Sequence, residues 1–318
     1  MQKKVVVFSQ INKEILTKLK AQYYVVEINP KLGDVNQQIL QEVQTADGMI
    51  GAGRVLNKSN LAGATRLKVI SSVSVGYDNY DLQYLKQQNI SLCHTPHVLT
   101  ETTADLAFTL LMSTARKVPK LDQWVKNAEW KKTVSPQYFG VDVFGKKLGI
   151  IGLGNIGAAI ARRGFYGFNM EILYHGRHEK PEIATALNAE YCSLNELLEQ
   201  SDFIVVAVDL NGESKALIGA EQFALMQSHA VFINISRGSV INEQALIYAL
   251  KTKQIYAAGL DVYEREPLSE SELFDLDNVV TLPHIGSATI ETRSKMAKLA
   301  YQNLVDVLEN RVPKYVVN

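Results

Sequence analysis

The 318-residue sequence is poor in cysteine, carries no net charge and contains no long apolar run. Its only two cysteines, Cys93 and Cys192, are too few for a disulfide framework, which favours a reducing cytoplasm over secretion. Thirty-three basic residues balance 33 acidic ones, so no overall field attracts nucleic acid or an anionic membrane. No apolar stretch approaches the ~20 residues of a membrane helix, and the amino terminus lacks a signal-peptide core. These absences predict a cytoplasmic protein without nucleic-acid or membrane partners.

What the sequence does have is an alternation of short β-branched runs and segments with helical periodicity. A first series extends from VVVF to ISLCH, and a second extends from KKLGIIG to VVTL. This rhythm is typical of βα units with parallel sheets. We therefore predict an α/β fold with two Rossmann-like or flavodoxin-like domains, and an active site in the cleft between them.

Two helical segments are expected to connect these series. The segment 100–116 is almost continuously apolar and offers Thr100 as an N-cap, as in a buried crossover helix. In the segment 291–310, six apolar residues recur at helical spacing and would form one face of a helix: Met296, Leu299, Ala300, Leu304, Val307 and Leu308. Because the second sheet is already complete, this last helix should return to the first domain. The predicted domains are 1–99 with 286–318, which binds substrate, and 100–285, which binds a dinucleotide.

The run IGLGNIG is a GxGxxG motif that follows an apolar strand and opens a helix. Its glycines suit a tight turn, close approach of a pyrophosphate, and close packing of helix on strand. The pyrophosphate would meet the free N–H groups at the positive end of the helix. The motif predicts a dinucleotide site formed by Gly152, Gly154, Asn155, Ile156 and Gly157.

The stretch LYHGRHEK lies where a site for NAD usually has an acidic residue that accepts hydrogen bonds from the ribose 2'-hydroxyl. Here His175 occupies that place, followed by Gly176 and Arg177, whose guanidinium suits a phosphate. We interpret this as selection of NADPH, with Arg177 as main determinant and His175, His178 and Lys180 as candidate helpers. The alternative is a solvated basic loop beside a site that also accepts NAD.

Three charged residues follow strands of the second series: Arg237 in NISRGS, Glu266 in EREP and His284 in PHIGSAT. Ligands bind outside the carboxyl ends of parallel strands, so the three could converge on one site. They could reduce a 2-oxo acid, with Arg237 gripping the carboxylate, His284 donating a proton and Glu266 favouring the imidazolium. Taken singly, each has a plainer interpretation: an ion pair, a solvated loop charge, and a hydrogen-bonded core histidine.

Several long motifs resemble the D-isomer-specific 2-hydroxyacid dehydrogenases, close to their glyoxylate/hydroxypyruvate reductase branch. They are SVGYDNYD, GLGNIG with IARR, NISRGSVINEQAL, AGLDVYEREPL and NVVTLPHIGSAT, and the match runs from about Val69 to about Ala300. The resemblance implies the same roles for Arg237, Glu266 and His284. It also implies that the backbone of Val75 and Gly76 binds the substrate carboxylate. Other implied site residues lie against the cofactor or line the cleft: Asp261, Ile235, Thr103, Gly286 and Ser287. A homodimer built largely through the second domain is implied as well.

Three features do not follow directly from the resemblance. Asp209 stands where many members have proline, and its charge would oppose NADPH if it faced the phosphate. Arg54, after the small residues 51–53, could meet the polar tail of a substrate larger than glyoxylate, such as hydroxypyruvate or 2-ketogluconate. The cluster CHTPH, which contains Cys93, His94 and His97, lacks the second ligand pair of a structural zinc site, so no metal is expected.

The sequence therefore predicts an NADPH-preferring reductase, with NADH as an alternative donor, that converts a small 2-oxo acid to a D-2-hydroxy acid. Two other interpretations remain. One is an NAD-linked dehydrogenase of the D-lactate or D-glycerate type. The other is a dinucleotide-sensing binding protein like the corepressors that share this fold, because fold alone does not determine function.

Overall fold

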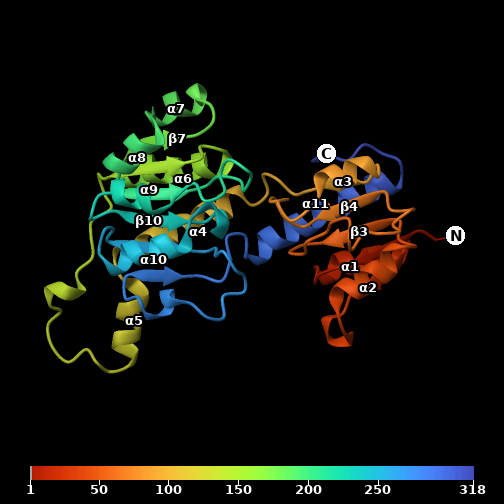
Figure 1. The fold of residues 1–318 in the computed structure, drawn as a ribbon, viewed down its shortest axis with the longest axis horizontal. Helices are drawn as coiled ribbons and strands as arrows, with labels where there is room; N and C mark the ends of the chain where they lie inside the picture. Colours follow the sequence, from red (N-terminus) through yellow and green to blue (C-terminus); the bar gives the residue numbers. More distant parts are fainter. Residues whose placement is uncertain (1) are drawn as a thin grey trace. The chain divides into compact units, whose positions relative to one another are not determined.

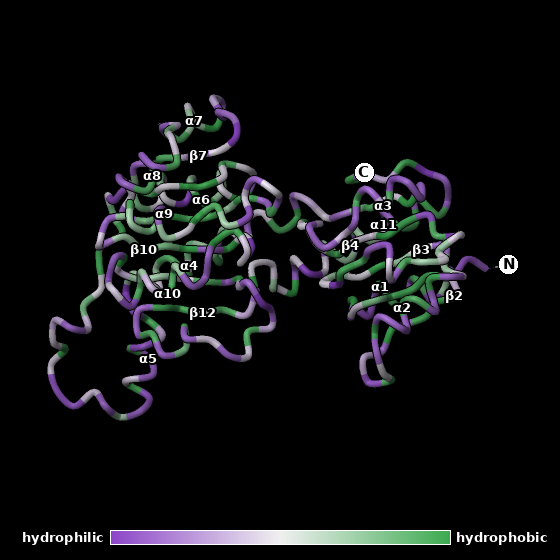
Figure 2. The backbone as a smooth tube through the Cα atoms, viewed as in Figure 1, coloured by the Kyte–Doolittle hydropathy of each residue, from purple (hydrophilic) through white to green (hydrophobic). Residues whose placement is uncertain are grey.

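The computed structural model describes residues 2–318 of the chain, which form two compact units (Figure 1). One unit combines the residues up to Leu99 with Ala288–Asn318, and the other is the continuous segment Thr100–Ser287. Figure 2 shows apolar residues concentrated on the strands of both units and polar residues on the connecting loops. Each unit therefore has a core of its own.

The first unit contains a five-stranded parallel sheet with the order β2-β1-β3-β4-β5. Its strands are β1 Lys4–Val7, β2 Tyr24–Glu27, β3 Gly48–Gly51, β4 Val69–Ser72 and β5 Ser91–Cys93. Its helices are α1 Lys13–Gln22, α2 Val35–Val43, α3 Leu82–Gln87 and α11 Ile290–Leu308, with a short 3-10 turn at Pro30–Leu32. Residues of α1 and α11 share one buried apolar cluster, and residues of α2 and α3 share another, so the sheet is covered on both faces.

The second unit contains a seven-stranded parallel sheet with the order β12-β11-β10-β9-β6-β7-β8. Its strands are β6 Lys147–Ile151, β7 Glu171–His175, β8 Glu190–Tyr191, β9 Phe203–Val206, β10 Val231–Asn234, β11 Ala257–Leu260 and β12 Val279–Thr281. The strand order reverses between β6 and β9. At such a switch point the loops after neighbouring strands part and leave a crevice, which is where open α/β sheets bind ligands.

The helices of the second unit are α4 Thr100–Ala115, α5 Val118–Lys126, α6 Asn155–Phe168, α7 Pro181–Leu187, α8 Leu194–Gln200, α9 Ala220–Leu225 and α10 Glu243–Lys251. Short 3-10 turns occur at Pro136–Tyr138, Gly238–Val240 and Glu272–Asp275. The central helix α4 packs against α6, β10 and β11, which explains its apolar sequence. Thr100 is already the first residue of α4, so the expected N-cap role is wrong by one position, within the usual variation of helix ends.

The predicted α/β class with two parallel sheets is confirmed. The last helix starts at Ile290, one residue before the predicted range, and ends at Leu308, two residues before the end of that range. Four of its six predicted apolar residues are buried, whereas Leu299 and Val307 are half-buried.

The sequence did not predict α5. This helix and the loop after it extend from the second unit as an arm (Figure 1). Among residues 2–318, no helix combines the length and apolar character that a membrane crossing requires.

Candidate active site

The glycine motif lies between β6 and α6, in the predicted order of strand, loop and helix. Gly152 has a φ of 100°, a left-handed conformation that a side chain would strain. A Cβ on Gly157 would lie 2.1 Å from the carbonyl oxygen of Gly152, so this position must be glycine for the helix to start so close to the turn. Both glycines are therefore required by the shape of the loop itself.

Gly154 differs from these two, because a Cβ on it would meet no atom within 4 Å. Gly154 is the N-cap of α6, and having no side chain it does not cap the first turn. The amide N–H groups of Asn155, Ile156 and Gly157 thus begin a 14-residue helix beside open space. A helix start of this kind suits a diphosphate, so the loop fits a dinucleotide.

The basic loop begins at the carboxyl end of β7, the neighbour of β6. His175 is half-buried, and its Nδ1 donates a 3.0 Å hydrogen bond to the carbonyl oxygen of Cys192. Its ring stacks on Tyr191 with an interplanar angle of 11°, and the Tyr191 hydroxyl donates to the carbonyl of Gly176. His175 and Gly176 are therefore held in place by the segment around β8.

Arg177 is exposed, and among residues 2–318 its guanidinium makes no recorded ion pair. His178 and Lys180 are exposed as well, and the backbone N–H of Lys180 donates to the hydroxyl of Tyr174. Asp209 is exposed after β9, where its carbonyl accepts a hydrogen bond from Ser214. The structure thus leaves the Arg177 side chain available for an external anion.

The structure brings Glu266 and His284 into direct contact. Oε2 of Glu266 lies 2.7 Å from Nδ1 of His284, and Oε1 accepts a hydrogen bond from the N–H of Tyr263. Glu266 follows β11 and His284 follows β12, so both come from the carboxyl ends of neighbouring strands. His284 has a φ of 53°, an uncommon value for a side chain other than glycine and one often found in functional sites.

Arg237 follows β10, the next strand of the same sheet. The residue after it, Gly238, touches the backbone of Tyr263 so closely that a Cβ would lie 1.8 Å from the Tyr263 carbonyl carbon. This contact ties the Arg237 segment to the loop that carries Glu266. Sequence reasoning missed Gly238, although its place after a strand and a charged residue was a usable signal.

The charge of Glu266 is stabilised by its neighbours. Burial by itself would raise the pKa of this carboxyl group, but the hydrogen bond and charge of His284 lower it. The N–H of Tyr263 and the charge of Arg237 act in the same direction, and the net effect is a lowered pKa. Glu266 is therefore a carboxylate at neutral pH, positioned to stabilise an imidazolium.

Asp261, at the end of β11, supports the segment after His284. It is 1% exposed, and its two carboxylate oxygens accept hydrogen bonds of 2.8 Å from the N–H groups of Ile285 and Gly286. Burial raises the pKa of Asp261, partly offset by these bonds and by the charge of His284. A Cβ on Gly286 would lie 3.4 Å from Thr103 Cγ2, so the two residues are neighbours. Ile235 is buried and Ser287 is half-buried.

Val75 and Gly76 lie in the first unit, in the loop after β4. Both are half-buried. The carbonyl of Val75 accepts a 3.0 Å hydrogen bond from Nδ1 of His94, and the carbonyl of Gly76 accepts a 2.7 Å hydrogen bond from Ser74 Oγ. The loop is therefore fixed by its own hydrogen bonds.

Comparison with known proteins gives a family and a set of relatives. Residues 108–286 match the family model described as "D-isomer specific 2-hydroxyacid dehydrogenase, NAD binding domain". A glyoxylate/hydroxypyruvate reductase B from Citrobacter koseri is 44% identical, with 100% of this chain and 98% of that protein covered. The protein of the same name from Salmonella typhimurium is 43% identical with the same coverage. The chain belongs to the D-isomer-specific 2-hydroxyacid dehydrogenase family.

Solved structures agree with this membership. The TT0316 protein of Thermus thermophilus superimposes with a TM-score of 0.89 at 34% identity, covering 99% of this chain and 100% of that one. An NADPH-dependent glyoxylate/hydroxypyruvate reductase from Sinorhizobium meliloti, solved with NADP and malonate, gives a TM-score of 0.87 at 30% identity, covering 100% of this chain and 97% of that one. The resemblance read from the sequence motifs is thus confirmed at the level of family and fold.

In this family member, the residues of the cluster CHTPH pack within the first unit. Cys93 is buried, and burial raises its pKa to about 12, so the thiol is not reactive. His94 makes edge contacts with Tyr77 and Tyr315 in addition to its bond to Val75. His97 lies against the Tyr315 ring, at a centroid distance of 5.7 Å.

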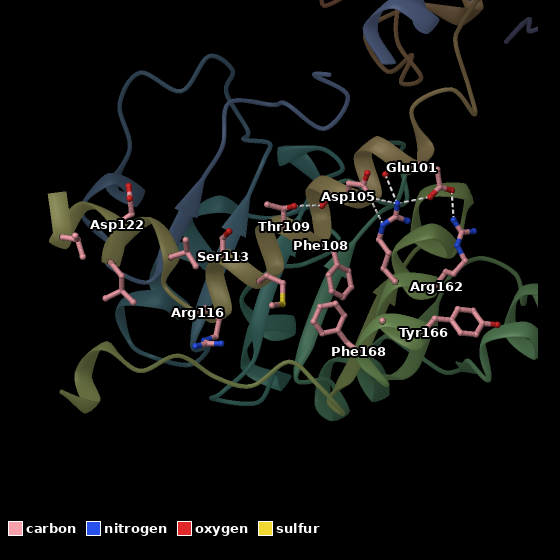
Figure 3. Close-up of a pocket in the computed structure, with 16 residues that line it drawn as sticks. Glu101, Asp105, Phe108, Thr109, Ser113, Arg116, Asp122, Arg162, Tyr166 and Phe168 are labelled. Atoms are coloured by element: carbon pink, nitrogen blue, oxygen red, sulfur yellow. Dashed lines mark hydrogen bonds and ion pairs between the residues drawn. The ribbon is translucent and has the colours of Figure 1, made fainter. Parts of the chain in front are cut away.

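The larger of the two cavities described in this dehydrogenase, 1370 Å³ in volume, is lined by none of the predicted site residues (Figure 3). It lies among α4, α5 and α6. Figure 3 shows the rings of Phe108 and Phe168 facing one another, with a centroid separation of 4.8 Å. Its other apolar lining residues include Met112, Val118, Leu121 and Val125. Because none of the catalytic candidates lines it, this cavity is not the candidate active site.

Proposed function

We propose that this protein reduces a small 2-oxo acid, with glyoxylate and hydroxypyruvate as the principal candidates, to the D-2-hydroxy acid with NADPH as preferred donor. The observation that carries the proposal is the 2.7 Å contact of Glu266 with His284 on the sheet that also bears the glycine loop. The names of the full-length relatives support the substrate class. NADH is the alternative donor.

In the proposed mechanism, the hydride that reaches the carbonyl carbon of the substrate would come from a reduced nicotinamide when one is bound. Arg237 grips the carboxylate and polarises the carbonyl, which prepares the carbon for attack. His284, as imidazolium, donates a proton to the carbonyl oxygen. Glu266 acts through His284: its carboxylate holds the ring by Nδ1 and leaves Nε2 for the substrate.

The dinucleotide would be held by the loop of Gly152, Gly154 and Gly157 and by the first turn of α6. Ile235, Asp261, Thr103 and Gly286 are proposed to lie against it. For the 2'-phosphate we assign Arg177, whose exposed guanidinium can form paired hydrogen bonds. His175 contributes differently: Nδ1 already donates to the Cys192 carbonyl, so a neutral ring presents Nε2 as an acceptor, which suits a hydroxyl better than a phosphate. This difference makes Arg177 the main determinant.

We assign substrate binding to the domain 1–99 with 286–318 and dinucleotide binding to the domain 100–285. In the former, the backbone N–H groups of Val75 and Gly76 are proposed to bind the substrate carboxylate. Ser287 is proposed as a further substrate contact.

Arg54 is proposed to meet the tail of a longer substrate such as hydroxypyruvate or 2-ketogluconate. It lines a 510 Å³ cavity together with polar side chains that include Asn36, Asn57 and Asn60. These amides can exchange hydrogen bonds with hydroxyl groups. The Arg54→Ala variant should lower kcat/KM for 2-ketogluconate more than for glyoxylate. An unchanged ranking of the two substrates would remove Arg54 from this role.

A homodimer is proposed, with the face of α4, α5 and α6 as its contact. Several apolar side chains on α5 and the loop after it are at least half exposed: Val118, Val125, Trp130 and Phe139. The larger cavity lies among the same three helices. Exposed apolar surface of this extent is typical of an interface. Light scattering coupled to size-exclusion chromatography should give twice the 35.4 kDa chain mass. A Val125→Glu variant should give the mass of a single chain.

We also propose a cytoplasmic location, in keeping with the two free cysteines.

The test of the function is NADPH oxidation by the purified protein with glyoxylate, hydroxypyruvate or 2-ketogluconate, followed by chiral analysis of the product. Turnover that yields the D-2-hydroxy acid supports the proposal. Turnover only with NADH and pyruvate would favour an NAD-linked dehydrogenase of the D-lactate type. Tight NADPH binding without turnover of any 2-oxo acid would favour a dinucleotide-sensing binding protein.

A further inference from the structure

The turn of Ser74, Val75 and Gly76 has every carbonyl oxygen occupied from within the first unit. The carbonyl of Ser74 accepts two hydrogen bonds from Thr95, one from its backbone N–H at 2.8 Å and one from its hydroxyl at 3.0 Å. The carbonyl of Val75 accepts from His94 Nδ1 at 3.0 Å, and that of Gly76 accepts from Ser74 Oγ at 2.7 Å. Since a carbonyl oxygen can only accept, His94 must carry its proton on Nδ1.

These bonds also determine where the N–H groups of the turn point. In a trans peptide, the N–H of one residue points opposite to the carbonyl of the residue before it. Among residues 2–318, the one cis peptide bond precedes Pro267, so both peptides of the turn are trans. Thr95 holds the Ser74 carbonyl and therefore turns the Val75 N–H away from itself. His94 holds the Val75 carbonyl and in the same way directs the Gly76 N–H outward.

Both N–H groups are left available for a ligand. Within the described part of the chain, no hydrogen bond from the N–H of Val75 or Gly76 is recorded. Two adjacent N–H donors of this kind form a concave site that binds an anion such as a carboxylate.

His94 is itself held from several sides. Its ring meets the edges of Tyr77 and Tyr315, with centroid distances of 5.8 and 6.4 Å. Its carbonyl accepts a hydrogen bond from Nδ2 of Asn303, a residue of α11 that is 0% exposed. Oδ1 of Asn303 in turn accepts from the N–H of Lys314. The orientation of the His94 ring is thus set by α11 and by the segment after it.

We infer that His94 and Thr95 are positioning residues that aim the Val75 and Gly76 N–H groups at the carboxylate of a 2-oxo acid. This inference rests on the proposed function, which assigns the carboxylate to this turn. Neither residue takes part in the chemical step. Their effect is to have both donors in place before the substrate arrives, so that binding does not require the turn to reorganise.

The experiment compares His94→Leu with His94→Asn, because the Asn amide places a donor close to the position of Nδ1 whereas Leu places none. The His229→Leu variant is the control for loss of a histidine: His229 is exposed, precedes β10 and pairs with Asp202. For each protein we would measure the KM for glyoxylate, kcat, the Kd for NADPH and, by calorimetry in the presence of NADP⁺, the Kd for oxalate. Oxalate serves as a carboxylate probe whose binding does not depend on turnover.

We expect His94→Leu to raise both the glyoxylate KM and the oxalate Kd on the order of tenfold, as for the loss of one well-placed hydrogen bond to a charged group. Its kcat should change by less than about threefold and its NADPH Kd should not change. His94→Asn should recover most of the loss. Thr95→Val, which removes one of the two bonds to the Ser74 carbonyl, should raise the oxalate Kd by a smaller factor, and it serves as the test if His94→Leu does not fold.

The outcomes separate this inference from the proposed function. Unchanged oxalate binding in both His94→Leu and Thr95→Val, with normal turnover, would overturn the positioning role and leave the reductase proposal standing. Suppose that wild type binds oxalate, that the variants bind it more weakly, and that no protein, wild type included, turns over a 2-oxo acid. In that case the positioning role holds and the proposed reaction fails. Failure of wild type to bind oxalate would overturn the inference.

Discussion

Glu266 and His284 are separated by 18 positions in the sequence, yet Oε2 of one lies 2.7 Å from Nδ1 of the other. The contact exists because β11 and β12 are parallel neighbours, so that the loops after them meet at one edge of the sheet. It leaves Nε2 of His284 as the ring nitrogen available to donate a proton.

The first prediction concerns that proton. Replacing His284 with Ala should lower kcat by on the order of 10²- to 10⁴-fold, the usual contribution of a positioned acid. NADPH binding, measured by fluorescence titration, should be unaffected because the glycine loop is intact. Near wild-type turnover would exclude His284 as the donor.

The second prediction concerns the charge of Glu266. Its pKa is lowered in the folded protein from 4.5, so the charge stabilises the fold above about pH 4.5, and this stabilisation is lost as the pH falls through the lower, folded value. Glu266→Gln should therefore lower the Tm at pH 7, and the difference from wild type should shrink as the pH is reduced below 4.5. Thermal unfolding at a series of pH values measures this. If the Tm difference between wild type and Glu266→Gln stays constant down to the lowest pH measured, the variant has lost packing rather than charge.

The third prediction concerns cofactor choice. Arg177→Ala should lower kcat/KM for NADPH by roughly 10- to 100-fold, as expected for hydrogen bonds to a charged group worth about 1.5 to 3 kcal/mol. It should leave kcat/KM for NADH nearly unchanged. Arg311→Ala is the matched control and should alter neither value, because it removes a surface arginine that pairs with Asp306 in the first unit. Equal use of both cofactors by wild type would mean that the basic loop does not select.

The fourth prediction separates two glycines of the same loop. Gly157→Ala should lower the Tm of the protein without ligand, because its Cβ would lie 2.1 Å from a backbone oxygen, a strain of about 1 to 3 kcal/mol. Gly154→Ala meets no atom within 4 Å, so the ligand-free Tm should stay the same while the NADPH Kd rises. If Gly154→Ala binds NADPH like wild type, the diphosphate does not approach this residue.

The elements of the fold could be predicted because β-branched runs and periodic apolar faces are local features of the sequence. The arm was missed although Val118, Leu121 and Val125 recur at helical spacing, because the segment is short and this apolar face stays exposed instead of packing on the core of the unit. Bringing Arg237, Glu266 and His284 to one edge required only the rule that ligands bind at the carboxyl ends of strands.

Contacts between distant segments could not be predicted in this way. Asp261 binds the N–H of Gly286, 25 positions later, and His94 binds the carbonyl of Val75, 19 positions earlier. Nothing in the neighbouring sequence of either residue signals its partner. Such contacts depend on strand order and register, which exist only in the folded chain.

The division of the chain also has a consequence for its synthesis. The second unit is one continuous segment, whereas the first unit lacks α11 until residues 290–308 have been made. Because α11 packs against β3 and β4, the first five strands emerge from the ribosome long before the helix that covers one of their faces. Domains usually fold in the order in which they are synthesised. Here the later unit can be complete while the earlier one still exposes apolar surface, which makes residues 1–99 the part of the nascent chain most dependent on chaperones.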